Sequence, residues 1–177
     1  MLEKSSEWEL AKLFFKKPLY SYHLREICRL LNWSPVKVRS YLKTLKENGL
    51  IVEYREKNLA LFKSCIGKES FKRYKLVYNL LQAYKIAEIL EEKLEYFDAI
   101  ILFGSSSRGE DTERSDFDIC IIGSKEVEIN LEKIEKELNR KISLLFIEEL
   151  KELKRKNKEL LNNLINGFVL RGYLKVL

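Results

Sequence analysis

The chain has 177 residues, of which 46 % are apolar and 34 % are charged, a composition typical of a globular protein with one or two domains. This composition excludes a disordered chain, and no apolar run reaches the roughly 18 residues that a membrane-spanning helix needs. The single histidine and the lack of a Cys-x-x-Cys spacing exclude the common zinc sites. The first ten residues lack an apolar signal-peptide core, and the three cysteines lie far apart in the sequence, so we expect a cytoplasmic protein with reduced thiols.

The positive charge is concentrated near the N-terminus. Residues 1–68 contain 14 lysines and arginines against 7 aspartates and glutamates, a net charge of +7, whereas residues 69–177 contain 19 against 20, a net charge of −1. A locally basic segment favours a polyanionic partner such as nucleic acid. The alternative is a lysine-rich surface that only keeps the protein in solution.

Helical periodicity predicts three helices in the first third of the chain, over residues 8–15, 21–31 and 34–48. The third begins with a serine and a proline, which are typical of a helix start, and a glycine follows its end. Two short apolar stretches come next, residues 50–54 and 59–63, and the four polar residues between them predict a β-hairpin with a charged tip.

Three helices followed by a basic hairpin resemble the winged helix-turn-helix family over residues 6–64. The resemblance implies that the helix at 34–48 enters the major groove of double-stranded DNA and that the hairpin tip contacts the backbone or the minor groove. A module that binds another protein is the alternative interpretation. The outward-facing residues that we expect to contact DNA are Lys37, Arg39, Ser40, Lys43, Arg55 and Lys57.

The segment 99–123 contains the motif that indicates chemistry. An apolar run ends at Gly104 and Ser105, and ten residues further on Asp116 and Asp118 lead into a second apolar run. In a strand, residues i and i+2 point to the same side, so the two carboxylates face one spot. Such a pair suits a hard cation such as Mg²⁺, and a glycine lets the backbone approach a phosphate group.

This spacing resembles that of the nucleotidyltransferase superfamily that includes DNA polymerase beta, in particular its minimal nucleotidyltransferase (MNT) branch, over residues 84–172. The resemblance implies an α+β fold with a mixed sheet and flanking helices. It also implies transfer of a nucleotidyl group, usually AMP from ATP, to a hydroxyl group with the help of two Mg²⁺ ions. The site residues that we assign are Gly104, Ser105 and Arg108 for the nucleotide triphosphate, and Asp116 and Asp118 for metal binding and catalysis.

The family places a third aspartate on the following strand, where it binds metal and activates the attacking hydroxyl group. The residue that we match to this position is Ser143, which does not ionise at neutral pH. Glu148 and Glu149 follow at the end of the same predicted strand. Three alternatives stay open: a neighbouring carboxylate takes the role, turnover is slow, or the domain binds nucleotide without turnover.

We expect a winged-helix domain at residues 1–66, one or two connecting helices at 67–97 and a nucleotidyltransferase-like domain at 98–177. A predicted helix at 150–163 carries a basic cluster, residues 154–158, which we interpret as a solvated face. The first functional hypothesis is a Mg²⁺-dependent nucleotidyltransferase attached to a DNA-binding domain. The second is a DNA-binding transcriptional regulator or MNT-type antitoxin that binds nucleotide without turnover. The partners that the resemblance implies are a HEPN-type toxin and a second copy of the chain.

Overall fold

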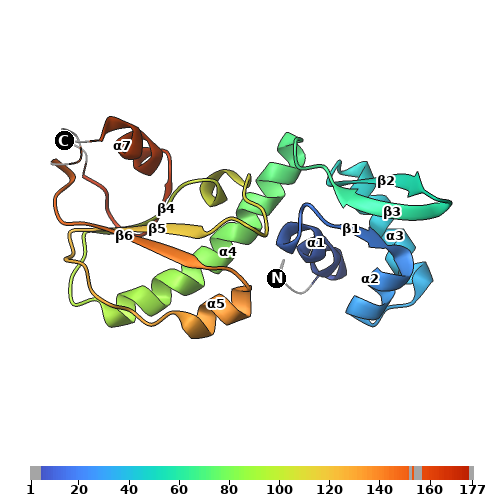
Figure 1. Cartoon of the computed structure of the whole chain (residues 1–177), viewed down its shortest axis with the longest axis horizontal. Helices are drawn as coiled ribbons and strands as arrows, with labels where there is room; N and C mark the ends of the chain where they lie inside the picture. The colour runs from blue at the N-terminus through green and yellow to red at the C-terminus, as the bar shows by residue number, and fades with distance from the viewer. Residues whose placement is uncertain (1–4, 152, 154–156, 176–177) are drawn as a thin grey trace. The chain divides into compact units, whose positions relative to one another are not determined.

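The computed structural model describes residues 5–151, 153 and 157–175, and the contacts divide the chain into two compact units, Met1–Tyr78 and Asn79–Leu177 (Figure 1). Each unit combines helices with a sheet, which agrees with the predicted α+β class. None of the helices in the described ranges is long and apolar enough to cross a membrane.

The first unit contains three helices, a short strand and a hairpin. In chain order the elements are α1 (Ser6–Lys16), β1 (Ser21–His23), α2 (Leu24–Leu31), α3 (Pro35–Glu47), β2 (Ile51–Glu56) and β3 (Leu59–Ser64). The strands form an antiparallel sheet in the order β1-β3-β2. The three helices and the hairpin therefore lie close to where the sequence predicts them.

The prediction that the second helix begins at residue 21 was wrong. Residues 21–23 are extended and pair with β3, and Tyr22 is buried opposite Phe62. The Tyr22 ring lies 5.2 Å from the Phe14 ring, and its hydroxyl group donates to the Leu13 carbonyl at 3.1 Å. These contacts are distant in sequence, so helical periodicity carries no sign of them. Helix α2 instead begins at Leu24.

Local sequence does determine both ends of α3 and the hairpin turn. The hydroxyl group of Ser34 accepts a hydrogen bond from the Lys37 N–H at 3.3 Å, and Gly49 after the helix has a φ of +69°. The hairpin turns over Lys57 and Asn58, both with positive φ, as a two-residue type I′ turn requires. The turn is shorter than predicted, and Arg55 lies in β2.

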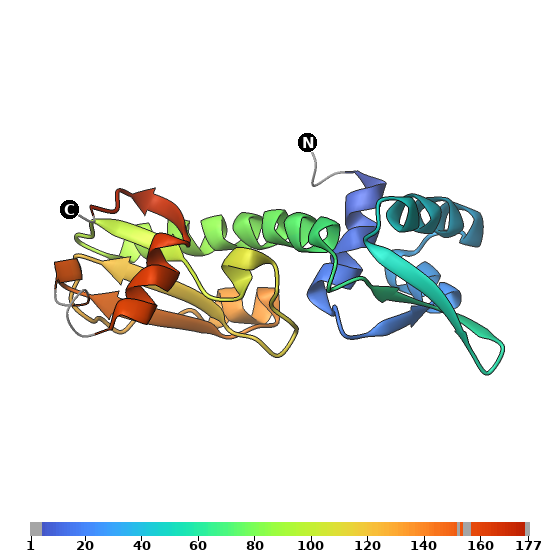
Figure 2. The ribbon, with the colours of Figure 1, turned by 90° about the horizontal axis from the view of Figure 1, so that it is seen from above.

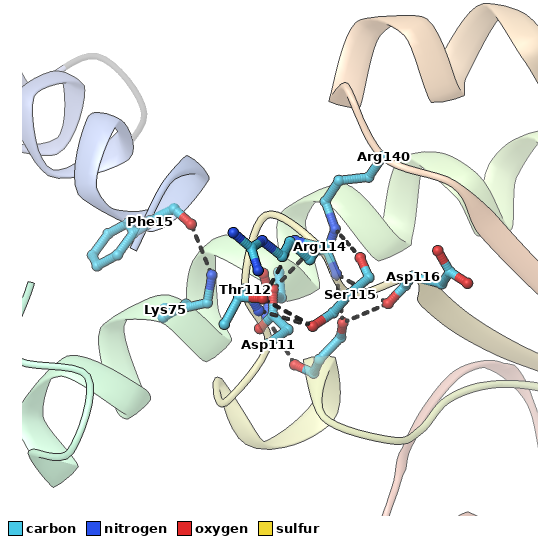
Figure 3. Close-up of polar contacts among 10 residues, drawn as sticks. Phe15, Lys75, Asp111, Thr112, Arg114, Ser115, Asp116 and Arg140 are labelled. Atoms are coloured by element: carbon cyan, nitrogen blue, oxygen red, sulfur yellow. Dashed lines mark hydrogen bonds and ion pairs between the residues drawn. The ribbon is translucent and has the colours of Figure 1, made fainter. Parts of the chain in front are cut away.

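The C-terminal end of α1 is held by two side chains from later in the chain. The last carbonyl groups of a helix have no partner within it. The Ser64 hydroxyl group donates to the Phe14 carbonyl at 3.2 Å, and the buried Lys75 ammonium donates to the Phe15 carbonyl at 2.7 Å (Figure 3). Lys75 thus neutralises part of the helix dipole at this end.

The second unit contains a mixed four-stranded sheet in the order β6-β5-β4-β7 (Figure 2). Strands β5 and β6 are parallel, whereas β4 is antiparallel to both β5 and β7. The elements are α4 (Glu69–Lys93), which starts in the first unit, β4 (Ala99–Leu102), the 3-10 helix η2 (Ser106–Arg108), β5 (Phe117–Ile122), α5 (Glu132–Leu138), β6 (Ile142–Ile147), α7 (Lys158–Ile165) and β7 (Phe168–Gly172).

Different helices cover the two faces of this sheet. Alternate residues such as Ile119 and Ile121 pack against α4 and α5, whereas Cys120 and Ile122 lie in the core that includes Leu164 of α7. Helix α7 begins after Asn157, whose side chain accepts from the Leu160 N–H at 3.0 Å, so the predicted helix is not continuous to residue 163. Residues 154–156 of the predicted basic cluster lie outside the described residues.

Candidate active site

The first half of the motif forms a tight turn at the end of β4. The Phe103 N–H donates to the Asp118 carbonyl at 3.1 Å, which holds the end of β4 against the start of β5. Gly104 then takes a φ of +71°, a conformation that other residues rarely adopt. The buried Ser107 hydroxyl group donates back to the Gly104 carbonyl at 2.8 Å and closes the turn.

The two halves of the motif meet at Gly104 and Asp118. A Cβ atom on Gly104 would overlap the Oδ2 atom of Asp118 and would lie 3.2 Å from its Cγ atom. Glycine is therefore favoured at this position for two reasons: its backbone conformation strains other residues, and a Cβ atom would displace the Asp118 carboxylate. Gly104, predicted to bind nucleotide, and Asp118, predicted to bind metal, thus lie next to each other.

The two aspartates lie at the start of β5. Asp116 is exposed just before the strand, and Asp118 is half-buried one residue inside it, while Phe117 between them is buried on the other face. Burial and, secondly, the negative charge of Asp116 raise the pKa of Asp118, and the positive charge of Arg140 opposes this rise. The two carboxylates therefore repel each other, which a bound cation would relieve.

Strand β6 places Ser143 directly beside Asp118. The two residues are paired in the parallel register and so share one face of the sheet, where Ser143 is exposed. Glu148 and Glu149 follow the other end of β6, about 16 and about 20 Å from Ser143 at roughly 3.3 Å per residue. They are too distant to supply a third carboxylate. No group of three or more His, Cys, Asp and Glu side chains suited to a metal ion occurs among the described residues.

The arginines of the loop lie at its surface. Arg108 is exposed at the end of η2, and its Nε–H donates to the Glu110 carboxylate at 2.9 Å. Arg114 is exposed near Asp116. Arg114 lines a pocket of about 450 Å³ together with Asp116 and Arg140, whereas Arg108 is not among the residues that line it.

Sequence reasoning missed a buried polar cluster behind the loop. The Arg140 guanidinium pairs with the Asp111 carboxylate at 2.7 Å and also donates to the carbonyl oxygens of Ser115 and Asp116, both at 3.0 Å (Figure 3). Asn79 of α4 donates to the same aspartate at 2.6 Å. Asp111 is 29 positions from Arg140 and 32 positions from Asn79 along the chain, so neither periodicity nor motif spacing predicts these contacts.

The predicted DNA contacts all lie on the surface of the first unit. Helix α3 buries Val38, Leu42 and Leu45 on one side. The opposite side and the hairpin expose the candidates Lys37, Arg39, Ser40, Lys43, Arg55 and Lys57. The Lys37 ammonium lies 4.0 Å from the centre of the Trp33 ring, a cation–π contact with a residue that precedes the helix.

Comparison with known proteins agrees with the geometry of the second unit. Residues 83–166 match the family model described as a nucleotidyltransferase domain. The match includes the Gly104-Ser105 turn, both aspartates and Arg140. It supports a nucleotidyltransferase-type domain in this part of the chain. A comparison with curated proteins found no match.

Proposed function

We propose that the second unit is a Mg²⁺-dependent nucleotidyltransferase domain that binds a nucleoside triphosphate, with ATP as the first candidate. The observation that carries this proposal is the contact between the Gly104 turn and the Asp118 carboxylate within the segment that matches the family. In the proposal, Gly104 and Ser105 bind the triphosphate, Arg108 pairs with a phosphate, and Asp116 and Asp118 hold the metal.

The chemistry of the donor groups fits Mg²⁺. Asp116 and Asp118 offer carboxylate oxygens at one edge of the sheet, and their mutual repulsion, expressed in the raised pKa of Asp118, would be relieved by a divalent cation. Mg²⁺ is commonly held by one or two carboxylates together with phosphate oxygens. When bound, it would neutralise charge on the triphosphate and orient the α-phosphorus for attack by a hydroxyl group.

The residues of the chain then have separate tasks. The turn at Gly104 lets the backbone approach the phosphates without a side chain in the way, and the Ser105 hydroxyl group is a hydrogen-bond donor beside it. The acceptor hydroxyl group attacks the α-phosphorus, the bond to the β-phosphate breaks, and pyrophosphate leaves. Because Ser143 is a poor proton acceptor, we expect the acceptor proton to pass to solvent and turnover to be slow.

The position of Ser143 beside Asp118 favours a second candidate function. In this alternative the chain is a DNA-binding regulator or MNT-type antitoxin whose second unit binds nucleotide without transferring it. Both candidates include binding of Mg²⁺ and nucleotide, and they differ only in whether the α-phosphate is transferred.

We also propose that residues 1–66 form a winged-helix domain that binds double-stranded DNA. Its net positive charge, its three helices with a hairpin, and the exposure of the basic side chains on α3 support this proposal. The domain boundaries at 66 and 97, the cytoplasmic location, a HEPN-type toxin partner and a homodimer remain predictions from the sequence.

The test begins with equilibrium binding of ATP to the full chain, with Mg²⁺ and with EDTA. We expect binding that requires Mg²⁺ and is lost in the Asp116→Asn/Asp118→Asn variant. Asp98→Asn is the matched control, because this exposed aspartate lies at the other end of β4 and an asparagine can still accept the hydrogen bond of Tyr96. Wild-type protein that does not bind ATP or another nucleoside triphosphate with Mg²⁺ would contradict the proposal.

Label transfer then separates the two candidates. The protein is incubated with ATP labelled at the α-phosphate, Mg²⁺ and a lysate of its source organism. A labelled macromolecule that requires wild-type Asp116 and Asp118 identifies an enzyme and its acceptor. Binding without transfer, together with transfer by the Ser143→Asp variant, identifies a nucleotide-binding domain in which the missing carboxylate limits turnover.

A further inference from the structure

We propose that Arg140 is a positioning residue that holds the two halves of the nucleotide site in one arrangement. Its guanidinium joins the turn that contains Ser106 to the segment that contains Asp116. This assignment rests on the proposed nucleotide-binding function and concerns a residue that lies outside the Gly-Ser and Asp-x-Asp motifs.

The fold delivers Arg140 to this place through the end of α5. Asn139 has a left-handed conformation with a φ of 52° and ends the helix. The Arg140 N–H then donates to the Glu135 carbonyl at 3.1 Å, a pattern typical of helix ends, and β6 begins two residues later at Ile142. The end of α5 therefore places the arginine beside the start of β5.

The guanidinium makes contacts to both halves at the same time. It donates to the Ser106 hydroxyl group at 3.1 Å on the side of the turn, and to the Ser115 and Asp116 carbonyl oxygens at 3.0 Å on the side of the aspartates. Its central carbon atom, Cζ, lies 4.5 Å from the centre of the Phe117 ring. Only the planar fork of an arginine offers several donors in fixed directions, because a lysine carries its donors on a single nitrogen.

A buried ion pair fixes the guanidinium itself. The side chains of Arg140 and Asp111 are 10 % and 0 % exposed, and their ion pair is 2.7 Å long. Asn79 holds the same region from α4, because its side-chain amide NH₂ group donates to the Asp111 carboxylate at 2.6 Å and to the Ser106 carbonyl at 2.9 Å. The cluster thus connects the loop to α4 on one side and to the end of α5 on the other.

These contacts define how Arg140 acts on the site. Its donors are directed to main-chain oxygens, a hydroxyl group and Asp111, so it acts through the positions of other residues. Without it, the turn and the aspartates lose a shared anchor and would have to be ordered by the nucleotide, which weakens binding. Loss of a residue that orients metal ligands typically lowers metal affinity about 10- to 100-fold.

The experiment compares Arg140→Lys and Arg140→Gln with the wild-type chain in equilibrium binding of ATP and Mg²⁺. We expect both variants to bind about 10- to 100-fold more weakly. The matched controls are Arg171→Lys and Arg171→Gln. Arg171 lies on the edge strand β7, is also partly buried, and pairs with Glu91 at 2.8 Å. We expect the control variants to bind ATP as the wild type does.

Hydrogen exchange gives a second readout that needs no nucleotide. In Arg140→Gln we expect faster amide exchange over residues 104–116, with no change in β7. Ser106→Ala removes the contact of the guanidinium with the Ser106 hydroxyl group, together with the 3.5 Å hydrogen bond that this hydroxyl group donates to the Asp116 carbonyl, while Asp111 is kept. This milder variant tests the same idea if the Arg140 variants do not fold, and we expect it to weaken binding and to speed exchange over residues 104–116.

The outcomes are distinguishable. Full rescue by Arg140→Lys would show that charge alone matters and would overturn the assignment. Folded Arg140→Gln that binds like the wild type, or whose residues 104–116 exchange at the wild-type rate, would also overturn it. If the wild-type chain itself binds no nucleotide with Mg²⁺, the proposed function fails and the assignment fails with it. If the wild type binds and the Arg140 variants bind and exchange as it does, only the assignment is overturned and the proposed function stays intact.

Discussion

Replacement of Gly104 by alanine tests the geometry of the site most directly. The alanine would have to keep a φ of +71°, which costs about 1–2 kcal/mol for a residue with a Cβ atom. The Cβ atom would also overlap the Asp118 carboxylate, and overpacking of this kind costs about 1–3 kcal/mol. Together these terms lower the free energy of unfolding of the second unit by about 2–5 kcal/mol.

Two other glycines separate the contributions. Gly49 has nearly the same conformation, with a φ of +69°, and an added Cβ atom would meet the Ser70 hydroxyl oxygen at 3.1 Å, far from Asp118 in sequence and in the other unit. We expect Gly49→Ala to cost only about 1–2 kcal/mol, mostly backbone strain. Gly67 has open space around it, so Gly67→Ala should change the stability by no more than about 1 kcal/mol.

The assay follows the two units separately because a chain of two units need not unfold in one step. Trp8 and Trp33 both lie in the first unit, so tryptophan fluorescence during urea unfolding reports that unit, and circular dichroism reports both. Gly49→Ala should shift the fluorescence transition to lower urea concentration. Gly104→Ala should leave the fluorescence transition unchanged and shift only the unfolding of the second unit, which circular dichroism detects.

Binding gives the decisive comparison for Gly104. Since the alanine displaces the Asp118 carboxylate, the folded Gly104→Ala variant should bind ATP with Mg²⁺ more than about 10-fold more weakly than the wild type. The reasoning is refuted if Gly104→Ala is as stable as Gly67→Ala, or if it binds ATP as tightly as Gly49→Ala does.

Three further predictions concern single side chains. Burial raises the pKa of the Cys120 thiol to about 12, so at pH 8 we expect mass spectrometry to find iodoacetamide on the half-buried Cys28 and Cys65 but not on Cys120. The raised pKa of Asp118 means that its ionised form is disfavoured in the folded state. Stability is therefore lost as the pH rises through this pKa, so without metal Asp118→Asn should be more stable than the wild type at pH 7, and the difference should vanish in urea titrations near pH 3. Finally, Lys37→Ala should weaken DNA binding and reduce the slope of log affinity against log salt by about 0.9 if Lys37 neutralises one phosphate, and an unchanged slope would remove it from the interface.

The sequence predicts those parts of the fold that depend on neighbours along the chain. Helix α3, the hairpin after it and the strands that flank the Gly104 turn all follow from caps, periodicity and glycine positions within a few residues. The strand at residues 21–23 could not be predicted in this way, because it forms through pairing with β3 some 40 residues later.

The same division holds within the candidate site. Asp116 and Asp118 could be predicted as a pair because their spacing of two favours one side of an extended segment and because the Gly104-Ser105 turn precedes them by ten residues. The neighbour of Asp118 across the sheet was matched to Ser143 by its place in the next strand, and the parallel register pairs these two residues. Arg140 and Asp111 were missed because a contact between a loop and a helix end has no fixed spacing in sequence.

The buried cluster also bears on the choice between the two proposed functions, nucleotide binding with and without transfer. An ion pair shut away from water is often no more stabilising than apolar residues of the same size, so stability alone is a weak reason for Arg140 and Asp111 to lie there. Their contacts instead fix the backbone at Ser106 and Asp116, on either side of the proposed phosphate and metal positions. Within the proposed function, this geometry serves to bind a nucleotide in a defined arrangement, and Ser143 beside Asp118 makes proton removal from an acceptor the step with the least support.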